Sequence, residues 1–523
     1  MNFASGRICL PTAVQDWAVV CKLQGGGVGK GCVKKPERSG AMLAYDELKG
    51  ASGRKMSYRP VRYDARRLFP TLPPRVKVRA NAYQLHNISL GGLAAIARHT
   101  NEDMLEVGEI VPLSVQQSGQ PIFESNARVC RTESTVFGSN VAFSFVDRFV
   151  EFDKLITHNT QAQMATQAAL LGPGAQLVPQ EYRAFCSDIL RVFRGYRAIL
   201  DANCTIASAI DAGFDHQSAF EGCEERFMQQ WRAFWRLGND FARDFEKDRD
   251  VKEASKEFTE LVLTPEFRLS ALWDRSYAKP LGYPGDFEIM NQFYNWQRVG
   301  GTAYEMLLHR AGLEMAECIK ARMEMARYHI GDVVRSRGVD RPARVLNVGC
   351  GSAREIQTLL DASRNGYPLA EFTLVDQEER ALRYAHDHIY PHVLASAERI
   401  RIQGLNLSFM DILREGGRIS ELPSQDMIYS LGLFDYLTDK RAAGLVRRLY
   451  DKLRPGGLMI IGNMNETSFS TLWPLEHVLD WTLIYRDEPQ MLAWAEGLPA
   501  SKAWTETEPT GRVRLLFVRK QTA

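Results

Sequence analysis

The chain has 523 residues with 45% hydrophobic and 24% charged content, an ordinary globular composition that predicts roughly three or four domains at about 150 residues each. The formal net charge of +2 argues against a protein that mainly coats nucleic acid, and no nucleic-acid partner is expected. No apolar run approaches ~18 residues, and nine scattered cysteines come without a signal peptide or zinc spacing, so we expect a cytoplasmic protein with no integral membrane segment and no metal site.

Residues 1–56 are expected to form a flexible N-terminal segment. They include Gln24-Gly-Gly-Gly-Val-Gly-Lys-Gly31, which superficially matches a phosphate-binding loop. Such a loop requires a glycine, four residues, then Gly-Lys and a Ser or Thr. Gln24 and Gly31 stand at the two positions that decide the motif, so we interpret the run as a glycine-rich tail.

Residues 58–155 are predicted to form a small β-barrel. Arg75-Val-Lys-Val-Arg79 alternates apolar and basic residues, and short β-type runs follow at 110–115, 127–130 and 141–145. Several short strands separated by turns are typical of such a barrel.

Two motifs in this region predict a nucleotide site. Arg62 and Arg66 form Arg-x-x-x-Arg, and Asn87, Ser89 and Gly92 form Asn-x-Ser-x-x-Gly. Arginine forks bind guanine edges and phosphates, and the turn exposes further donors, so the two motifs suit a guanine dinucleotide. The region resembles the PilZ domain, and this resemblance implies cyclic di-GMP binding by these five residues. The alternative is a degenerate PilZ fold that serves only as a docking surface.

The arginine motif can also be read in a second register, in which Arg66 opens Arg66-Arg67-Leu-Phe-Pro70. That register loses the second arginine, so the Arg62/Arg66 register is favoured. Residues 54–79 hold nine Lys or Arg and one acid, which fits a doubly anionic ligand. Few aromatic residues lie between these basic residues, unlike in proteins that bind single-stranded nucleic acid.

Residues 156–335 are predicted to be a helical substrate or lid region. Apolar residues recur at three- and four-residue steps over 185–200 and 227–245, and 302–336 is another long amphipathic stretch. Between them lies Tyr277-Ala-Lys-Pro-Leu-Gly-Tyr-Pro-Gly-Asp286. A rigid segment rich in tyrosine, proline and glycine suits a lid or pocket wall, and the alternative is a plain turn between helices.

Residues 336–523 alternate strand and helix patterns. Apolar strand candidates lie at 344–348, 372–376, 426–430 and 457–461, which predicts a parallel, doubly wound α/β sheet of the Rossmann-like class. The whole chain is therefore expected to be multidomain, with a PilZ-like barrel, a helical region and this C-terminal sheet.

The first two strand candidates carry a cofactor motif. Gly349 and Gly351 follow one apolar run, and Asp376 ends the next, where an acid accepts hydrogen bonds from ribose hydroxyls. Dinucleotides and S-adenosylmethionine (SAM) both use this geometry. Arg354 stands where a dinucleotide site needs its third glycine, and Asp411 can accept from the adenine amino group, so SAM is favoured. Asn347, in the same run as the glycines, is included in the expected cofactor site.

These residues, with the turn Leu453-Arg-Pro-Gly-Gly-Leu458, resemble the class I SAM-dependent methyltransferases over 344 to about 465. The chain departs from the common Gly-x-Gly-x-Gly pattern at Ala353. The resemblance implies SAM as methyl donor.

The expected catalytic residues are Tyr283 and Lys279 in the Pro-Gly segment, Asp435 and Tyr436 after the fourth strand, and Arg486. A cation can orient a carboxylate, and tyrosines can position an oxygen by hydrogen bonding. Lys-Pro-Leu-Gly-Tyr-Pro-Gly-Asp, Gly-Leu-Phe-Asp-Tyr-Leu and Trp-x-Leu-Ile-Tyr-Arg together resemble the bacterial 3-hydroxypalmitic acid methyl ester biosynthesis family, over roughly 160–520. That resemblance implies carboxyl O-methylation of a 3-hydroxy fatty acid, free or carrier-bound, to a methyl ester signal used in quorum sensing.

Two other hypotheses remain open at this point. The enzyme can act on another small molecule or on a protein, or the methyltransferase fold can be a relic in a non-catalytic signalling adaptor. Intact Gly349, Gly351 and Asp376 weigh against the adaptor.

Overall fold

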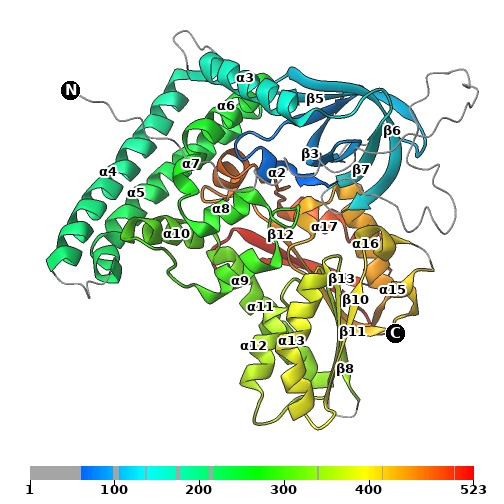
Figure 1. Ribbon diagram of the computed structural model, residues 1–523. Coiled ribbons are helices and arrows are strands. Elements are labelled where there is room, and N and C mark those ends of the chain that lie inside the picture. The colour runs from blue at the N-terminus through cyan, green and yellow to red at the C-terminus, as the bar shows by residue number, and fades with distance from the viewer. Residues whose placement is uncertain are drawn as a thin grey trace, which may run out of the picture. The chain divides into compact units, whose positions relative to one another are not determined.

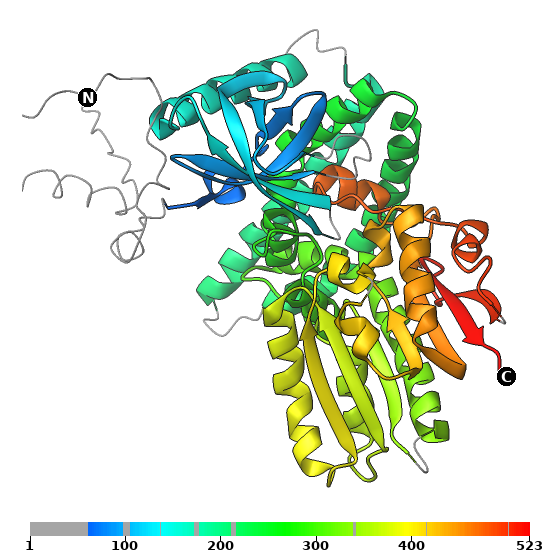
Figure 2. The ribbon, with the colours of Figure 1, turned by 90° about the vertical axis from the view of Figure 1, so that its right-hand side faces the viewer.

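The computed structural model describes residues 61–97, 105–135, 138–171, 177–210, 216–337, 341–414, 416–499 and 501–522. The expected flexible segment 1–56 and its glycine-rich run lie outside these ranges. Figures 1 and 2 show a barrel in blue, helices in green and a sheet from yellow-green to red. Across the described ranges, no helix is long and apolar enough to cross a membrane, and no group of three or more His, Cys, Asp or Glu side chains could hold a metal ion.

The predicted small barrel is confirmed, and six strands close it. β3 pairs with both β2 and β4, so the ring runs β3-β2-β5-β6-β7-β4, and β1 adds to the outside of β3. Apolar and basic residues alternate along β2, so that Val76 and Val78 point into the barrel core and their basic neighbours point out. The elements are β1 (Tyr63–Asp64), α2 (Ala65–Leu68), β2 (Arg75–Val78), β3 (Asn81–Ser89), β4 (Gly92–Ala97), β5 (Ile110–Gln117), β6 (Gln120–Thr135) and β7 (Gly138–Phe145).

A helical region follows the barrel, as predicted. The expected stretch 302–336 is two helices, because the chain leaves helical geometry at Ala316. Side-chain caps begin several of the helices, for example Asp286, which accepts from the Ile289 N–H at the start of α9. The elements are α3 (Phe152–Leu171), α4 (Gln180–Ile210), α5 (His216–Phe245), α6 (Arg249–Val262), α7 (Thr264–Phe267), α8 (Ala271–Ala278), α9 (Phe287–Asn295), α10 (Ala303–Met315) and α11 (Glu317–Arg337).

The C-terminal region is a seven-stranded, doubly wound sheet. The strand order is β10-β9-β8-β11-β12-β14-β13. The four predicted strands and β10, which was not predicted, run parallel. β14 runs antiparallel to β12 and β13 antiparallel to β14, so the sheet is mixed rather than wholly parallel. The strands are β8 (Ala343–Val348), β9 (Ala370–Asp376), β10 (Ile400–Asn406), β11 (Gln425–Ser430), β12 (Leu453–Met464), β13 (Ser501–Thr507) and β14 (Val513–Lys520).

Helices cover both faces of this sheet. α11, α12 (Arg354–Ala362) and α13 (Glu379–Ala395) pack on one face, while α16 (Asp439–Asp451) and α17 (Glu488–Ala493) pack on the other. Neighbouring strand residues alternate between the two cores: Val345 belongs to one and Leu346 to the other. The shorter elements are α14 (Phe409–Leu413), α15 (Arg418–Glu421), η3 (Phe434–Tyr436) and η4 (Pro474–Val478).

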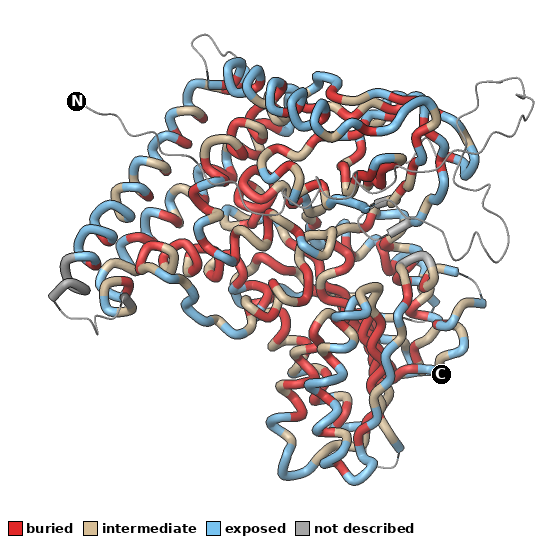
Figure 3. The backbone as a smooth tube through the Cα atoms, in the orientation of Figure 1, coloured by how far each residue is buried: buried red, intermediate tan, exposed pale blue. Residues whose placement is uncertain are grey.

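One of these cores continues into the helical region. Buried aromatic side chains join the two: the Trp473 Nε1–H donates to Tyr182 Oη at 2.8 Å, and the Trp235 Nε1–H donates to the Ser470 carbonyl at 2.8 Å. A Cβ at Gly238 would lie 2.4 Å from the Trp473 ring, so helix α5 needs glycine there. Buried segments, red in Figure 3, occur in both the helices and the sheet, and their side chains belong to one core.

Candidate active site

A large pocket lies at the carboxyl ends of the central strands. Its walls include Gly349 after β8, Asp376 at the end of β9 and Gly432 after β11, so it straddles the point where the strand order reverses. Ligands of open α/β sheets bind at this switch point.

The glycine loop and Asp376 form one hydrogen-bonded unit. Gly349 and Gly351 have φ values of 69° and 51°, in the left-handed region that glycine adopts without strain. The Gly351 N–H donates to Asp376 Oδ2 at 2.8 Å, and the Glu378 N–H donates to Oδ1 at 2.9 Å. Burial raises the pKa of Asp376, while these two N–H groups oppose the rise. Both carboxylate oxygens are therefore fixed in position at the pocket wall.

Asn347 lines the pocket beside a buried acid that the sequence did not single out. The Asn347 Nδ2–H donates to Glu355 Oε1 at 2.9 Å, and the Tyr429 hydroxyl donates to the same oxygen at 2.7 Å. Glu355, the second residue of α12, is only 4% exposed, and burial raises its pKa against the effect of these donors. Asn347 thus holds a second carboxylate at the pocket wall.

Asp435 and Tyr436 both line the pocket from the short helix η3. Asp435 Oδ1 accepts from the Met464 N–H at 2.6 Å, and burial raises the Asp435 pKa to about 6 although Arg322 opposes that rise. Tyr436 Oη accepts from the Trp481 Nε1–H at 3.0 Å. The Tyr283 ring lies in the same wall, and burial raises the pKa of both tyrosines, so each hydroxyl keeps its proton.

Gly285 explains part of the predicted Pro-Gly segment. A Cβ at this position would lie 2.8 Å from the Trp481 ring and 3.1 Å from Tyr436 Oη, and its φ is 73°. Tyr283, Pro284 and Gly285 all line the pocket. The segment is therefore a pocket wall rather than a plain turn.

Arg486 does not line the pocket but supports the turn that does. It is 2% exposed, and its Nη1–H donates to the Phe434 carbonyl at 3.1 Å and to Asn463 Oδ1 at 2.9 Å. Its remaining groups donate to Asp439 Oδ1 at 2.8 Å and to the Leu437 carbonyl. These bonds hold η3 from both ends, which makes Arg486 a positioning residue for Asp435 and Tyr436.

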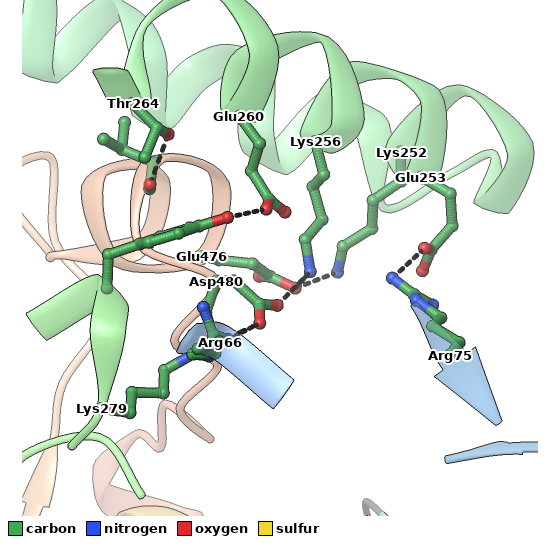
Figure 4. Close-up of polar contacts among 12 residues, drawn as sticks. Arg66, Arg75, Lys252, Glu253, Lys256, Glu260, Thr264, Lys279, Glu476 and Asp480 are labelled. Carbon is green, nitrogen blue, oxygen red and sulfur yellow. Dashed lines mark hydrogen bonds and ion pairs between the residues drawn. The ribbon is translucent and has the colours of Figure 1, made fainter. Parts of the chain in front are cut away.

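Lys279 and Asp411 also lie outside the pocket lining. The Lys279 Nζ donates to the Asp480 carbonyl at 2.5 Å and pairs with its carboxylate at 3.3 Å (Figure 4). Asp411 accepts from the Ser408 hydroxyl at 2.6 Å, which lowers its pKa, although its neighbour Ile412 does reach the pocket.

The five expected nucleotide residues lie on or beside the barrel strands. Arg62 is exposed, and Asn87 faces Asp64 across β1 and β3. Arg66 is engaged elsewhere: it pairs with Asp480 at 2.7 Å. The Ser89 hydroxyl donates to the Gly92 carbonyl at 3.1 Å, and a Cβ at Gly92 would lie 2.2 Å from the Phe143 carbonyl oxygen, so this glycine has a packing role.

The Arg66–Asp480 pair belongs to a buried ionic cluster between α2, α6 and the segment after η4. Arg66 lies over the Tyr277 ring at 4.8 Å, and the Tyr277 hydroxyl donates to Glu260 Oε2 at 2.8 Å (Figure 4). Lys256 on α6 approaches Asp480 at 3.9 Å. Asp480 immediately precedes Trp481, so the cluster adjoins the pocket wall.

Sequence reasoning missed Arg322 and Glu355 because charged residues in helices usually face solvent. Arg322 is 5% exposed and lines the pocket from α11. A signal was available: it falls four residues after Cys318 and four before Ala326, both buried, and so lies on the apolar stripe of its helix.

Comparison with known proteins agrees with this geometry in one region. Residues 346–459, less than half of the chain, match the family model of a methyltransferase domain. No curated protein matches the chain. The domain assignment therefore rests on this family match together with the strand order.

Several solved structures are similar at low identity. A possible exported protein from Bordetella parapertussis is 18% identical, with a TM-score of 0.39 over 60% of this chain and 98% of its own. Magnesium protoporphyrin IX methyltransferase from Synechocystis PCC 6803 with bound SAH is 13% identical, with a TM-score of 0.33 over 47% and 97%. An O-methyltransferase family protein from Burkholderia thailandensis is 16% identical, with a TM-score of 0.30 over 41% and 61%.

Proposed function

We propose, from the methyltransferase domain at 346–459, that the protein is a SAM-dependent methyltransferase. The observation that carries this proposal is the Gly351–Asp376 unit at the switch point of the sheet. An acid fixed by backbone N–H groups at the end of the second strand is suited to accept from ribose hydroxyls.

The charges of the pocket support SAM over a dinucleotide. Asp376, Glu355 and Asp435 line it, and Arg322 is the opposing guanidinium. SAM carries a sulfonium, an ammonium and one carboxylate, which match this balance of charges. A doubly anionic pyrophosphate would instead meet three carboxyl groups, and like charges at close range are unfavourable.

The proposed acceptor is a 3-hydroxy fatty acid, methylated on its carboxyl group. Apolar side chains from the helical region, from η4 and from the segment after it line the pocket and could receive an acyl chain: Met290, Phe293, Met315, Leu475 and Leu483. Tyr283 and Tyr436 could donate hydrogen bonds to an oxygen of the acid. The carboxylate is already a nucleophile, so as its oxygen bonds to the methyl carbon and the carbon–sulfur bond breaks, no general base is needed, only alignment and exclusion of water.

Methyl transfer to 3-hydroxy fatty acids tests this function directly. We expect purified protein with methyl-labelled SAM to convert long-chain 3-hydroxy acids to labelled methyl esters, detected by mass spectrometry. 3-Hydroxybutyrate is the matched control: it keeps the reacting groups but lacks the chain, so its conversion should be much slower. Binding of SAM without ester formation from any such free acid would reject the acceptor and keep the cofactor.

The barrel is proposed to bind cyclic di-GMP and to regulate this activity. Arg62 is exposed for such a ligand, whereas recruitment of Arg66 would require its bond to Asp480 to break. Trp481 follows Asp480 in the chain, and its indole N–H donates to the Tyr436 hydroxyl in the pocket wall. Loss of the Arg66–Asp480 ion pair would therefore be expected to shift Trp481 and, with it, Tyr436.

Calorimetry with cyclic di-GMP tests the regulatory proposal. We expect heat of binding from the wild type and a much weaker signal from Arg62→Ala, since a charge-assisted bond to phosphate or guanine is typically worth about 1.5–3 kcal/mol. Arg131→Ala removes an exposed arginine from β6 as a control and should bind like the wild type. Absence of heat from the wild type would show that the barrel does not sense this nucleotide.

A further inference from the structure

Arg322 is a buried cation whose hydrogen-bonding capacity is only partly used by the described residues. It is 5% exposed and lines the pocket, yet its Nε and Nη1 have no hydrogen-bond partner among the described residues. The nearest acid is Asp435, whose Oδ2 lies 3.8 Å from Nη1, beyond hydrogen-bonding distance. A guanidinium carries five N–H donors, and burying such a group without bonds is costly.

The backbone opposite Arg322 keeps this space open. A Cβ at Gly432 would lie 2.9 Å from Arg322 Nη2, so any larger residue after β11 would push the guanidinium from its place. Asp435 cannot neutralise it fully, because burial also penalises the charge on that carboxyl group. The arginine is therefore arranged for a group outside the described residues.

Carboxylate is the ligand chemistry that fits. The planar guanidinium fork matches the two oxygens of a carboxylate, and it is less strongly hydrated than an ammonium, which suits a buried position. Glu355 lies in the same pocket, and its charge interacts with that of Arg322. A ligand end that carries a carboxylate and an ammonium group would find a partner for each.

The pocket could receive two ligand carboxylates, that of SAM and that of the proposed fatty acid. The position of Arg322 favours the first. A ribose held at Asp376, on β9, places the rest of the cofactor across Gly349 toward Gly432, at the neighbouring strands β8 and β11. Arg322 lies at that end, against Gly432.

We propose that Arg322 binds the carboxylate of the amino-acid end of SAM, with Glu355 facing its ammonium group. This inference rests on the proposed function, and it assigns the recognition of the methionine part to α11 and α12 rather than to the glycine loop alone.

Calorimetry with two ligands tests the assignment. S-adenosylhomocysteine carries the amino-acid end, and 5′-methylthioadenosine lacks it. For Arg322→Gln we expect the Kd of S-adenosylhomocysteine to rise by about 30-fold or more, as for truncation of one partner of a buried charge pair, with the Kd of 5′-methylthioadenosine unchanged. Arg327→Gln is the matched control: it lies on the same helix, pairs with Glu324 and does not line the pocket, so both affinities should equal those of the wild type.

Thermal unfolding of ligand-free Arg322→Gln is measured alongside. Since the substitution also removes the ion pair with Asp435 at 3.8 Å, a fall in Tm is expected, and a purely structural role would weaken the binding of both ligands equally. Equal affinity of wild type and Arg322→Gln for S-adenosylhomocysteine, or a parallel loss for both ligands, would overturn the assignment. An unchanged S-adenosylhomocysteine Kd with a raised KM for the acid would transfer Arg322 to the acceptor. Failure of the wild type to bind S-adenosylhomocysteine would instead reject the proposed function.

Discussion

Asp376→Asn should weaken binding of S-adenosylhomocysteine by more than about a hundredfold, equivalent to about 3 kcal/mol. The carboxylate accepts from the Gly351 and Glu378 N–H groups through different oxygens, and an amide can keep only one of these bonds. The amide NH₂ group would then face one of these backbone N–H groups, donor against donor. It also could not accept a hydrogen bond from a ribose hydroxyl. Calorimetry measures the Kd, and methyl transfer should fall with it.

Asp361→Asn provides the control for this substitution. Asp361 lies near the end of α12, is largely exposed and pairs with Arg364, so the same chemical change there should leave the Kd unaltered. Wild-type affinity in Asp376→Asn would mean that the acid ending β9 does not contact the cofactor, and the case for SAM would lose its main support.

Arg486→Ala should lower the free energy of unfolding by about 3–5 kcal/mol, because each buried acceptor left without its donor costs roughly 1–3 kcal/mol. The substitution leaves the Phe434 and Leu437 carbonyls without their donor and removes the cation 4.8 Å from the Trp494 ring. Arg486→Lys should be intermediate, because a lysine keeps the charge without the fork. Thermal unfolding followed by calorimetry should show the order wild type, Lys, Ala.

Arg519→Ala is the reference for this series. Arg519 is exposed on β14, and surface substitutions of this kind usually change stability by less than about 0.5 kcal/mol. If Arg486→Ala were as stable as the wild type but had lost methyl transfer, Arg486 would have to act on the substrate rather than on the stability of η3. A destabilised protein agrees with the contacts that hold η3.

The sequence could predict those parts of the site whose residues directly follow a strand, because the strand pattern alone places them at the carboxyl end of the sheet. Gly349, Gly351 and Asp376 follow strands, and adjacent parallel strands must bring their carboxyl ends together. Asp435 and Tyr436 reach the pocket for the same reason, since β11 pairs with β8.

Lys279 and Arg486 show where such reasoning stops. Both were expected to orient an acid because each is a cation in a distinctive motif. Their partners, Asp480 and the carbonyls around η3, come from segments whose packing depends on the whole fold. A motif gives the type of a side chain but not the direction in which tertiary packing turns it.

The sheet itself was only partly predictable. β10 was missed because its residues are mostly exposed, as suits an edge strand, so no continuous apolar run marks it. The antiparallel strands β13 and β14 lie beyond the alternating strand–helix pattern, and direction cannot be read from hydrophobicity.

The aromatic core shared by the helices and the sheet limits how this enzyme could be divided or recombined. Trp473 and Ser470 lie in the sheet region, but their partners Tyr182 and Trp235 belong to helices more than two hundred residues earlier. A fragment that begins near residue 336 would expose that apolar surface to water and should aggregate. Helices grafted from another protein would leave Trp473 and Ser470 without these partners, so the helices and the sheet could not be exchanged separately.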